Sequence, residues 1–251
     1  MPATPNALIT GTSSGLGEGL ARALLQRDWV VYGCSRRPSR LAGLKTTQLD
    51  LTDHDAIGPS LDQLLDDAPR LDLVVLNAGI LGEIRDIGKT PLDDLKAVME
   101  TNVWANKTVL DWLINWDRPI GQIVLISSGA AVLGNRGWAG YALSKATLNM
   151  LAKLYAHEFT DTHLCALAPG IIDTAMMHQL CDNTDPEAFP AMQRLQKARG
   201  TDAMPGPVGA AENILSILDQ LAERPTGSFV DIREILDPDG YAALFGQRSS
   251  G

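Results

Sequence analysis

Short hydrophobic runs alternate with amphipathic stretches along almost the whole chain. Some runs are continuously apolar, such as Leu73-Val74-Val75-Leu76, which is typical of strands buried on both faces of a sheet. Between the first two runs, Leu16, Leu20 and Leu24 recur at helical spacing. The pattern predicts seven strands, at Ala7–Thr10, Trp29–Cys34, Thr46–Leu49, Leu71–Leu76, Gln122–Ile126, Leu164–Ala168 and Ser228–Val230.

This alternation predicts one α/β domain over residues 1–251, a doubly wound Rossmann fold with a mostly parallel seven-stranded sheet between layers of helices. Thr90-Pro91-Leu92-Asp93 has the pattern of a capped helix start, with Thr90 as the cap and a helix running towards Asn115. From about residue 175 to Pro207 the pattern loosens and is rich in Met, Pro and Gly. We interpret this segment as a lid inserted over the sheet, and residues 247–251 as a loose tail.

The composition of the chain excludes several classes of function. The net charge of −9 and the pI of about 4.9 argue against binding to nucleic acid or to an acidic membrane surface. No apolar run is long enough to span a bilayer, and the first residues lack the pattern of a secretory signal. Cys34, Cys165 and Cys181 fit no zinc spacing and suggest a reducing compartment. We therefore expect a cytoplasmic protein with no metal site.

A glycine-rich turn, Thr10-Gly11-Thr12-Ser13-Ser14-Gly15-Leu16-Gly17, follows the first predicted strand and opens the first predicted helix. Glycines let the backbone approach a pyrophosphate, and the helix N-terminus offers free N–H groups. The spacing differs from the commoner G-x-G-x-x-G pattern, but its place at the first strand–helix junction favours a dinucleotide site. The predicted contacts are Gly11, Ser13, Ser14, Gly15, Leu16 and Gly17.

The end of the second predicted strand indicates which dinucleotide binds. A carboxylate at this position binds a ribose 2′-hydroxyl, whereas basic residues accept a 2′-phosphate. The chain has Cys34-Ser35-Arg36-Arg37-Pro38-Ser39-Arg40 there, with no carboxylate. Because an arginine fork can hold a phosphate through two charge-assisted hydrogen bonds, Arg36 and Arg37 predict NADP(H) as the cofactor.

Tyr141 and Lys145 are four residues apart in a predicted helix, so both side chains should lie on one face. Ser128 stands thirteen residues before Tyr141, just beyond a predicted strand. A phenol beside a fixed cation and a hydroxyl can donate or accept a proton near neutral pH. These three residues are the predicted centre of the chemistry.

The order and spacing of these motifs resemble the short-chain dehydrogenase/reductase family, over roughly Ala7 to Thr174. The resemblance implies adenine contacts at Asp50 and Leu51, and a turn over the adenine ribose at Asn77-Ala78-Gly79, where Leu76 replaces a commoner Asn. It makes Asn102, in Thr101-Asn102-Val103, the fourth member of a catalytic tetrad with Ser128, Tyr141 and Lys145. It also implies nicotinamide contacts at Pro169, Ile172 and Thr174, in Pro169-Gly170-Ile171-Ile172-Asp173-Thr174.

The resemblance implies hydride transfer between the nicotinamide and a carbonyl carbon. Ser128 would hold the carbonyl oxygen, Tyr141 would transfer the proton, and Lys145 would bind the nicotinamide ribose. Asn102 would support a water chain to Lys145. Lowering the Tyr141 pKa from about 10 to about 7 requires roughly 4 kcal/mol of phenolate stabilisation, which we expect from Lys145 and the oxidised cofactor.

We therefore predict an NADPH-dependent reductase of ketones or diketones, similar to the sepiapterin reductase and benzil reductase branch. A 3-oxoacyl-carrier-protein reductase shares every motif, but the chain shows no basic docking patch outside the predicted phosphate site. A non-catalytic NADP(H)-sensing regulator is the alternative from another class, although the intact tetrad argues against it. A sugar-nucleotide epimerase shares Tyr-xxx-Lys but normally has a longer chain and a different glycine spacing.

The family implies a homodimer or homotetramer, formed through the helices that begin near Thr90 and Tyr141. The sequence leaves open the substrate, the stereochemistry, the preferred direction and the oligomer size. The four histidines show no ligand spacing. Whether His178 or the Met-rich segment contacts substrate is also left open.

Overall fold

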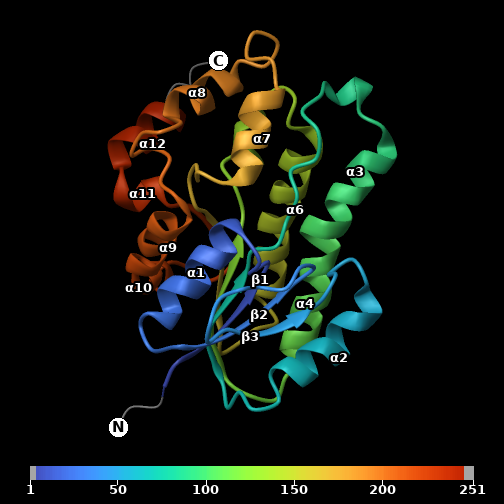
Figure 1. The fold of residues 1–251 in the computed structure, drawn as a ribbon, viewed down its shortest axis with the longest axis vertical. Coiled ribbons are helices and arrows are strands. Elements are labelled where there is room, and N and C mark those ends of the chain that lie inside the picture. Colours follow the sequence, from blue (N-terminus) through green and yellow to red (C-terminus); the bar gives the residue numbers. More distant parts are fainter. Residues whose placement is uncertain (1–3, 246–251) are drawn as a thin grey trace.

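The computed structural model describes residues 4–245, which form a seven-stranded parallel sheet in the order β3-β2-β1-β4-β5-β6-β7 (Figure 1). All seven predicted strands are confirmed, with ends within two residues of those predicted. Their bounds are β1 Asn6–Thr10, β2 Val30–Ser35, β3 Lys45–Gln48, β4 Leu71–Leu76, β5 Ile120–Ile126, β6 His163–Ala168 and β7 Ser228–Asp231.

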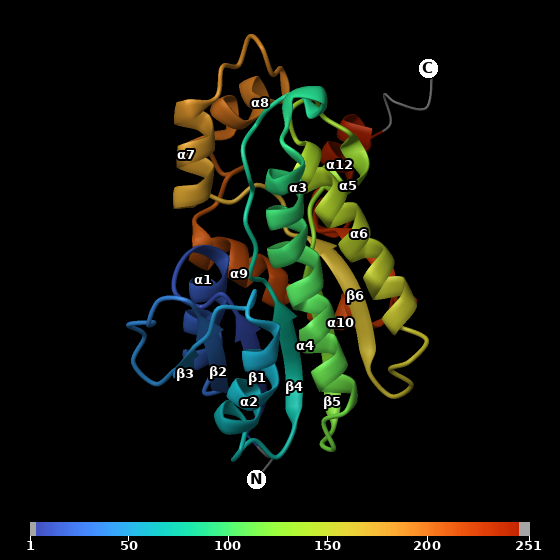
Figure 2. The same cartoon turned by 90° about the vertical axis from the view of Figure 1, so that its right-hand side faces the viewer.

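Helices cover both faces of the sheet, which confirms the predicted fold class (Figure 2). One apolar core joins the sheet to α2 (His54–Leu64), α4 (Ala105–Ile114) and α6 (Ala139–Tyr155). A second core joins the other face to α1 (Gly15–Leu25), α9 (Pro207–Ser216) and α10 (Leu218–Ala222). The continuous apolar strands occur because both faces are covered in this way.

The helix predicted from Thr90 to Asn115 is interrupted. It consists of α3 (Leu92–Met99), a π-helical turn η2 (Glu100–Trp104) and α4. The prediction of Thr90 as the cap is wrong: Pro91 holds the cap position, and the Thr90 hydroxyl donates to the Asp86 carbonyl at 3.0 Å. That bond closes the preceding 3₁₀ turn η1 (Ile87–Lys89), so the hydroxyl serves the turn before the helix.

The segment after β6 forms α7 (Ala175–Asn183) and α8 (Ala191–Ala198), which lie beyond the carboxyl ends of the strands (Figures 1 and 2). Thr174 caps α7, since its hydroxyl accepts a hydrogen bond from the Met177 amide at 3.2 Å. Both helices lie within the residues predicted as an inserted lid, and that interpretation stays a prediction. The short helices α5 (Ala130–Leu133), α11 (Arg233–Leu236) and α12 (Pro238–Phe245) complete the fold.

Three further sequence predictions concern the cysteines, membrane crossing and the C-terminal tail. Cys34, Cys165 and Cys181 are buried and form no disulfide. Among residues 4–245, no helix has the length and apolar character that crossing a membrane requires. The predicted tail at residues 247–251 lies outside the described residues.

Candidate active site

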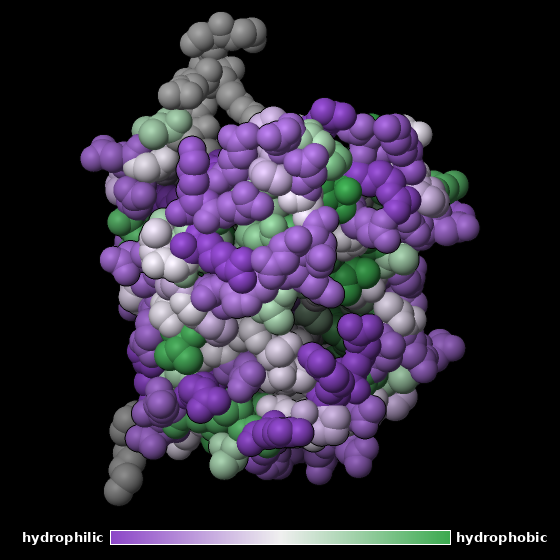
Figure 3. Space-filling view, turned by 45° about the horizontal axis from the view of Figure 1, so that its top comes forward, coloured by the Kyte–Doolittle hydropathy of each residue, from purple (hydrophilic) through white to green (hydrophobic). Residues whose placement is uncertain are grey.

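Two cavities meet at the carboxyl edge of the sheet. The larger, of about 340 Å³, extends over the ends of β1, β2, β4 and β5, and the smaller, of about 120 Å³, lies beneath α7 and α8. On the face that carries α7 and α8, Figure 3 shows a hollow with apolar residues at its walls and hydrophilic residues around it. Six residues line both cavities: Ser128, Tyr141, Gly170, Thr174, Met176 and Met177.

The larger cavity brings together nearly all the residues predicted to contact the dinucleotide. They are Gly11, Ser13, Ser14, Gly15, Leu16, Arg36, Arg37, Asp50, Leu51, Asn77, Ala78, Gly79, Tyr141, Lys145, Pro169, Ile172 and Thr174. The one predicted contact that does not line it is Gly17. An ideal Cβ at Gly17 would lie 2.3 Å from the Gly11 carbonyl oxygen, so this glycine permits close packing of the turn.

The glycine turn is held by hydrogen bonds from the neighbouring strand end. The Thr10 hydroxyl accepts from the amides of Asn77 and Ala78 at 2.9 and 3.0 Å, and the Asn77 side-chain amide donates to the Thr10 carbonyl at 2.9 Å. Gly15 has a φ of +62°, a left-handed conformation that glycine adopts without strain. The two turns therefore form one rigid wall of the cavity.

Basic side chains lie at the rim where β2 ends. Arg36 and Arg37 line the cavity, and Arg37 Nη2 lies 3.4 Å from the Ser14 hydroxyl oxygen, on the glycine turn. Asp50, on the neighbouring strand end, accepts hydrogen bonds from the Thr52 amide and hydroxyl, which lower the pKa of its carboxyl. The two arginines thus give this end of the larger cavity positive charge.

Tyr141 and Lys145 lie in the first two turns of α6, as their spacing predicts. The Lys145 ammonium is 5.6 Å from the centre of the Tyr141 ring and donates a hydrogen bond to the Ile126 carbonyl at 2.6 Å. Lys145 is 3 % exposed, and burial lowers its pKa to about 8. The last carbonyl of β5 therefore fixes this ammonium close to the phenol.

The fall in the Tyr141 pKa that we expect from Lys145 together with the oxidised cofactor stays a prediction, and the protein without cofactor differs from it. Burial raises the pKa of the phenol, and the hydrogen bond with Ser128 offsets only part of that rise. In the protein alone, the Lys145 ammonium near the ring donates its hydrogen bond to the Ile126 carbonyl. Tyr141 therefore begins as a neutral phenol, the form needed to donate a proton.

The two serines that follow β5 have different environments. Ser127 is 1 % exposed and its hydroxyl pairs with the Asn149 side chain at 2.5 Å. Ser128 lines both cavities, and its hydroxyl accepts from the Ala130 amide at 3.1 Å. This placement agrees with the choice of Ser128 from its spacing to Tyr141.

Asn102 does not line either cavity, although it lies directly behind the wall. Its side chain forms a pair of 2.8 Å hydrogen bonds with the backbone of Ile80 and a 2.9 Å bond with the Ser144 hydroxyl. An ideal Cβ at Gly79 would be 3.1 Å from Asn102 Oδ1 and 3.6 Å from Lys145 Nζ. Asn102 thus holds the loop after β4 against α6, and the predicted water chain stays a prediction.

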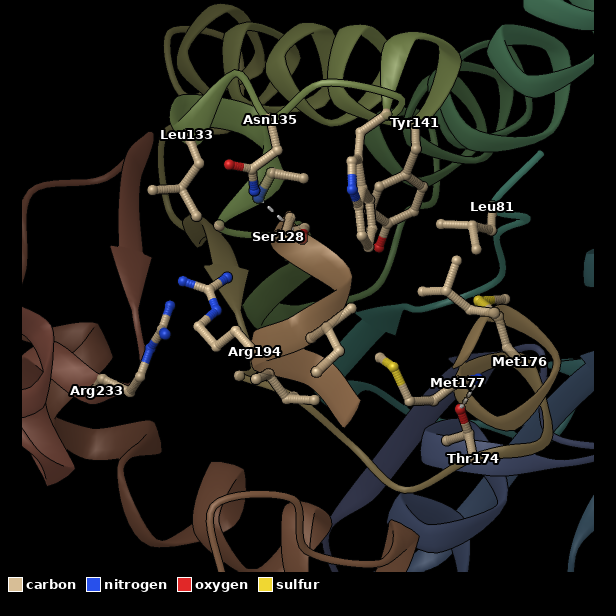
Figure 4. A pocket seen from close by; sticks show the side chains of 18 residues that line it. Leu81, Ser128, Leu133, Asn135, Tyr141, Thr174, Met176, Met177, Arg194 and Arg233 are labelled. Carbon is tan, nitrogen blue, oxygen red and sulfur yellow. Dashed lines mark hydrogen bonds between the residues drawn. The ribbon is translucent and has the colours of Figure 1, made fainter. Parts of the chain in front are cut away.

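The smaller cavity has a mostly apolar wall that the sequence analysis identified only in part. Of the Met-rich segment, Met176, Met177 and Leu180 line it, whereas Met192 and Met204 are buried in packing contacts. His178 lines neither cavity and pairs with Asp173 at 2.5 Å. Lining residues that the sequence did not indicate are chiefly Arg194, within the Met-rich segment, and Leu81, Leu133, Asn135, Trp138 and Arg233 from other segments. Figure 4 shows Leu81, Leu133, Asn135, Arg194 and Arg233 around the cavity. No sequence motif marks them, because only the folded chain brings them together.

Comparisons with known proteins agree with this geometry. The family model for short chain dehydrogenases matches residues 5–185. A benzil reductase ((S)-benzoin forming) of Bacillus subtilis is 30 % identical over 243 residues, covering 91 % of this chain and 98 % of its own. An NADPH-dependent pterin aldehyde reductase of Arabidopsis thaliana is 30 % identical over 195 residues, covering 72 % of this chain and 81 % of its own.

A solved structure has the same fold. A short chain dehydrogenase/reductase from Saccharomyces cerevisiae superimposes with a TM-score of 0.81 at 21 % identity, over 96 % of this chain and 98 % of that chain. The predicted resemblance to the benzil and sepiapterin reductase branch is confirmed by the names of the relatives. The chain is an oxidoreductase that belongs to the short-chain dehydrogenase/reductase family.

Proposed function

We propose that this oxidoreductase is an NADPH-dependent carbonyl reductase that converts ketones and vicinal diketones to alcohols. The observation that carries the proposal is the position of Ser128 and Tyr141, which line both cavities. Groups on this shared wall can reach a cofactor on one side and a substrate on the other. The benzil reductase relative suggests the diketone as the test substrate.

The residues of the larger cavity fit NADPH. The glycine turn would hold the pyrophosphate. Arg36 and Arg37 would bind the 2′-phosphate. Asp50 and Leu51 would contact the adenine. Asn77, Ala78 and Gly79 would cover the adenine ribose, and Lys145 would bind the nicotinamide ribose. Pro169, Ile172 and Thr174 would contact the nicotinamide end. When bound, the cofactor supplies a hydride from the nicotinamide ring.

The protein contributes the proton and the stabilisation of negative charge. As a carbonyl is reduced, charge builds up on its oxygen, and the Ser128 hydroxyl can donate a hydrogen bond to it. The Tyr141 phenol, kept neutral by burial, gives its proton to the same oxygen. Lys145, with a pKa of about 8, stabilises the phenolate that remains and can return a proton. Asn102 acts as a positioning residue, through its bonds to Ile80 and Ser144.

The test is NADPH consumption with benzil and with a panel of aromatic ketones, quinones, steroids and acyl thioesters. Tyr141→Phe should reduce kcat for benzil by about a thousandfold, since general acid catalysis typically contributes between 10² and 10⁴. NADPH affinity, measured by fluorescence titration, should stay within about twofold.

Tyr155→Phe is the matched control for this variant. Tyr155 lies on the same helix, and its hydroxyl contacts Asp111 at 2.5 Å, away from both cavities. Retained turnover in Tyr141→Phe would remove the assigned role of the phenol. If no compound in the panel is reduced by the wild-type protein, the sensor alternative gains support. Preferred turnover of an acyl thioester would favour the carrier-protein reductase.

We also propose that the chain forms a homo-oligomer through α6 and the helices beside it. Leu143, Met150 and Leu154 are 49 %, 53 % and 54 % exposed, and they are spaced seven and four residues apart along α6. Trp104 of η2 adds a further exposed apolar side chain. A molar mass of one chain in light scattering would contradict this proposal.

A further inference from the structure

One buried donor near the reacting groups has no hydrogen-bond partner. Trp138 is 8 % exposed, and its indole N–H is shielded from solvent and makes no hydrogen bond within the part of the chain that the structure describes. Buried donors are rarely left unpaired, because the hydration that they lose is not replaced. An indole N–H can donate but not accept, so the group that is missing at Trp138 is an acceptor.

The surroundings of the Trp138 ring indicate where an acceptor can come from. The ring packs in an apolar cluster with Ala130, Leu180 and Leu195. Trp138 lines the smaller cavity and does not line the larger one. The acceptor is therefore expected from a molecule in the smaller cavity, which we propose for the substrate, and not from the cofactor.

The backbone around Trp138 is fixed from several sides. The Trp138 carbonyl accepts from the Ala142 amide at 2.7 Å in the first turn of α6. On the preceding side, the Arg85 amide donates to the Gly137 carbonyl at 3.1 Å, which joins this segment to the loop after β4. An ideal Cβ at Gly137 would be 2.6 Å from the Phe189 ring, so the chain between α7 and α8 packs against the residue before Trp138. A donor on so fixed a segment needs little ordering when a ligand binds.

The carbonyl that is reduced does not need this donor. A carbonyl oxygen has two lone pairs, and in the proposed mechanism Ser128 and Tyr141 each donate to one of them. Trp138 is therefore available for a different oxygen of the same molecule. The centres of the Trp138 and Tyr141 rings are 6.0 Å apart, so that second oxygen would lie close to the reacting carbonyl.

We infer that Trp138 determines the choice of substrate, because its indole N–H binds an oxygen on the carbon next to the carbonyl that Tyr141 protonates. Vicinal diketones carry an oxygen at that position, and simple ketones do not. A site with a buried donor discriminates against an analogue that leaves the donor unpaired. This inference rests on the proposed reductase function and adds the residue that makes the site selective for vicinal diketones.

The test compares two substrates of the same skeleton. Benzil and deoxybenzoin share both phenyl groups and one ketone, and a methylene group in deoxybenzoin replaces the second carbonyl of benzil. Trp138→Phe should lower kcat/KM about tenfold more for benzil than for deoxybenzoin, since only benzil loses a hydrogen bond. The second carbonyl also makes the first more electrophilic, so the measured quantity is the change in the benzil-to-deoxybenzoin ratio between wild type and variant. An unchanged or higher ratio would overturn the inference.

Two further proteins separate the N–H from the size of the ring. Benzothienylalanine at position 138 keeps a bicyclic ring and has sulfur in place of the N–H, so it should lower the ratio as Trp138→Phe does. This protein decides the question if Trp138→Phe does not fold, and a wild-type ratio in it would reject the assigned contact. Trp112→Phe is the matched control, because the Trp112 indole donates to Asp62 at 3.0 Å and lies outside both cavity linings. It should keep the wild-type ratio.

A binding measurement detects the contact without turnover. The indole proton of Trp138 is identified in the NMR spectrum by its loss from either protein substituted at this position. In wild type loaded with NADP⁺, this proton should shift downfield with benzil and less with deoxybenzoin, which carries the same two phenyl rings. Equal shifts with both ligands, or no shift with either, would reject the contact.

Failure of this inference can be distinguished from failure of the proposed function. If wild type reduces benzil and the substituted proteins keep the wild-type ratio, the reductase function stands and the inference falls. If wild type reduces no compound, the reductase function falls, and the NMR titration alone decides whether Trp138 binds the second oxygen.

Discussion

The two cavities that meet at Tyr141 are built in different ways. The larger cavity, proposed for the cofactor and called here the cofactor cavity, is lined largely by short turns that directly follow strands, two of which are bonded to each other through Thr10 and Asn77. The smaller cavity, proposed for the substrate, takes much of its lining from loops and helices beyond the strands, including Leu81, Leu133 and Arg233. The difference shows that short sequence motifs mark the lining of the larger cavity, whereas the smaller cavity exists only once α7 and α8 lie over the sheet.

If the cofactor wall is a rigid backbone motif, a single methyl group at its tightest point should have the largest effect. Gly17→Ala would place a Cβ 2.3 Å from the Gly11 carbonyl and 2.6 Å from Asn77 Nδ2. We expect NADPH affinity to fall by about a hundredfold, equivalent to roughly 2.7 kcal/mol, together with a loss of stability of about 2 kcal/mol. Fluorescence titration and urea unfolding measure the two effects.

Gly88→Ala is the control for this variant, because no heavy atom lies within 4 Å of its Cβ position. It should bind NADPH like the wild type. Equal NADPH affinities for Gly17→Ala and Gly88→Ala would show that the glycine turn can adjust to a side chain and is not rigid.

Lys145, which lines the larger cavity, should make the stability of the fold depend on pH by a similar amount. Burial lowers its pKa from 10.5 to about 8, so between these values the unfolded chain holds a proton that the folded chain has lost. Raising the pH through this window therefore favours the folded state, by up to about 3 kcal/mol from this group in the cofactor-free protein. Urea unfolding of wild type and Lys145→Met from about pH 8 to about pH 10.5 isolates this contribution as a difference.

Two buried cysteines change the stability in the opposite direction as the pH rises. The contribution of Lys145 is therefore measured as the difference between wild type and Lys145→Met. Burial raises the pKa of the Cys34 and Cys165 thiols to about 12, so above their ordinary value of 9.0 the unfolded chain ionises first and stability falls. Lys153→Met changes an exposed lysine on the same helix and serves as the control. A constant difference between wild type and Lys145→Met over this pH range would contradict the lowered pKa.

At the rim of the cofactor cavity, a substitution should weaken cofactor binding less than Gly17→Ala does, and it should affect NADPH but not NADH. Arg36→Ala should raise the KM for NADPH about tenfold while changing the KM for NADH by less than about twofold, because only NADPH has the 2′-phosphate. Arg40→Ala, in the same loop but outside the cavity lining, should change neither. Equally efficient turnover with NADH and NADPH in the wild type would contradict the cofactor assignment.

The substrate side should respond least to loss of a single contact. Arg136 Nε and Nη2 donate to the Asp86 carboxylate at 2.6 and 2.9 Å, and Nη1 donates to the Ala188 carbonyl at 3.2 Å. Arg136 therefore connects the chain between α7 and α8 to the loop that contains Asp86 and to its own loop before α6. Arg136→Gln should lower kcat/KM by no more than about fivefold, since exposed ion pairs contribute little. Hydrogen exchange of residues 184–191 should increase while NADPH affinity is retained. A matching loss of NADPH affinity would mean that the two cavities do not act independently.

The strands were predictable because each is a local property of the chain. A strand buried on both faces must be apolar throughout, and a run such as Leu73–Leu76 can then be read without knowledge of its neighbours. The start of the helix after Thr90 was not predictable in the same way. The Thr90 hydroxyl could cap this helix or close the turn that precedes the helix. Contacts of the preceding loop decided that choice.

The sequence by itself determined the sheet, the glycine turn and the spacing of Ser128, Tyr141 and Lys145, because short-range geometry fixes each of them. Only the tertiary structure decided the state of those groups. Burial in the fold raises the pKa of Tyr141, and the carbonyl of Ile126 holds the Lys145 ammonium 5.6 Å from the centre of the Tyr141 ring. The arginines at positions 194 and 233 are far apart in the chain, and the fold brings α8 and α11 to the walls of one cavity. Burial and long-range contact are properties of the folded chain, so no motif could encode them.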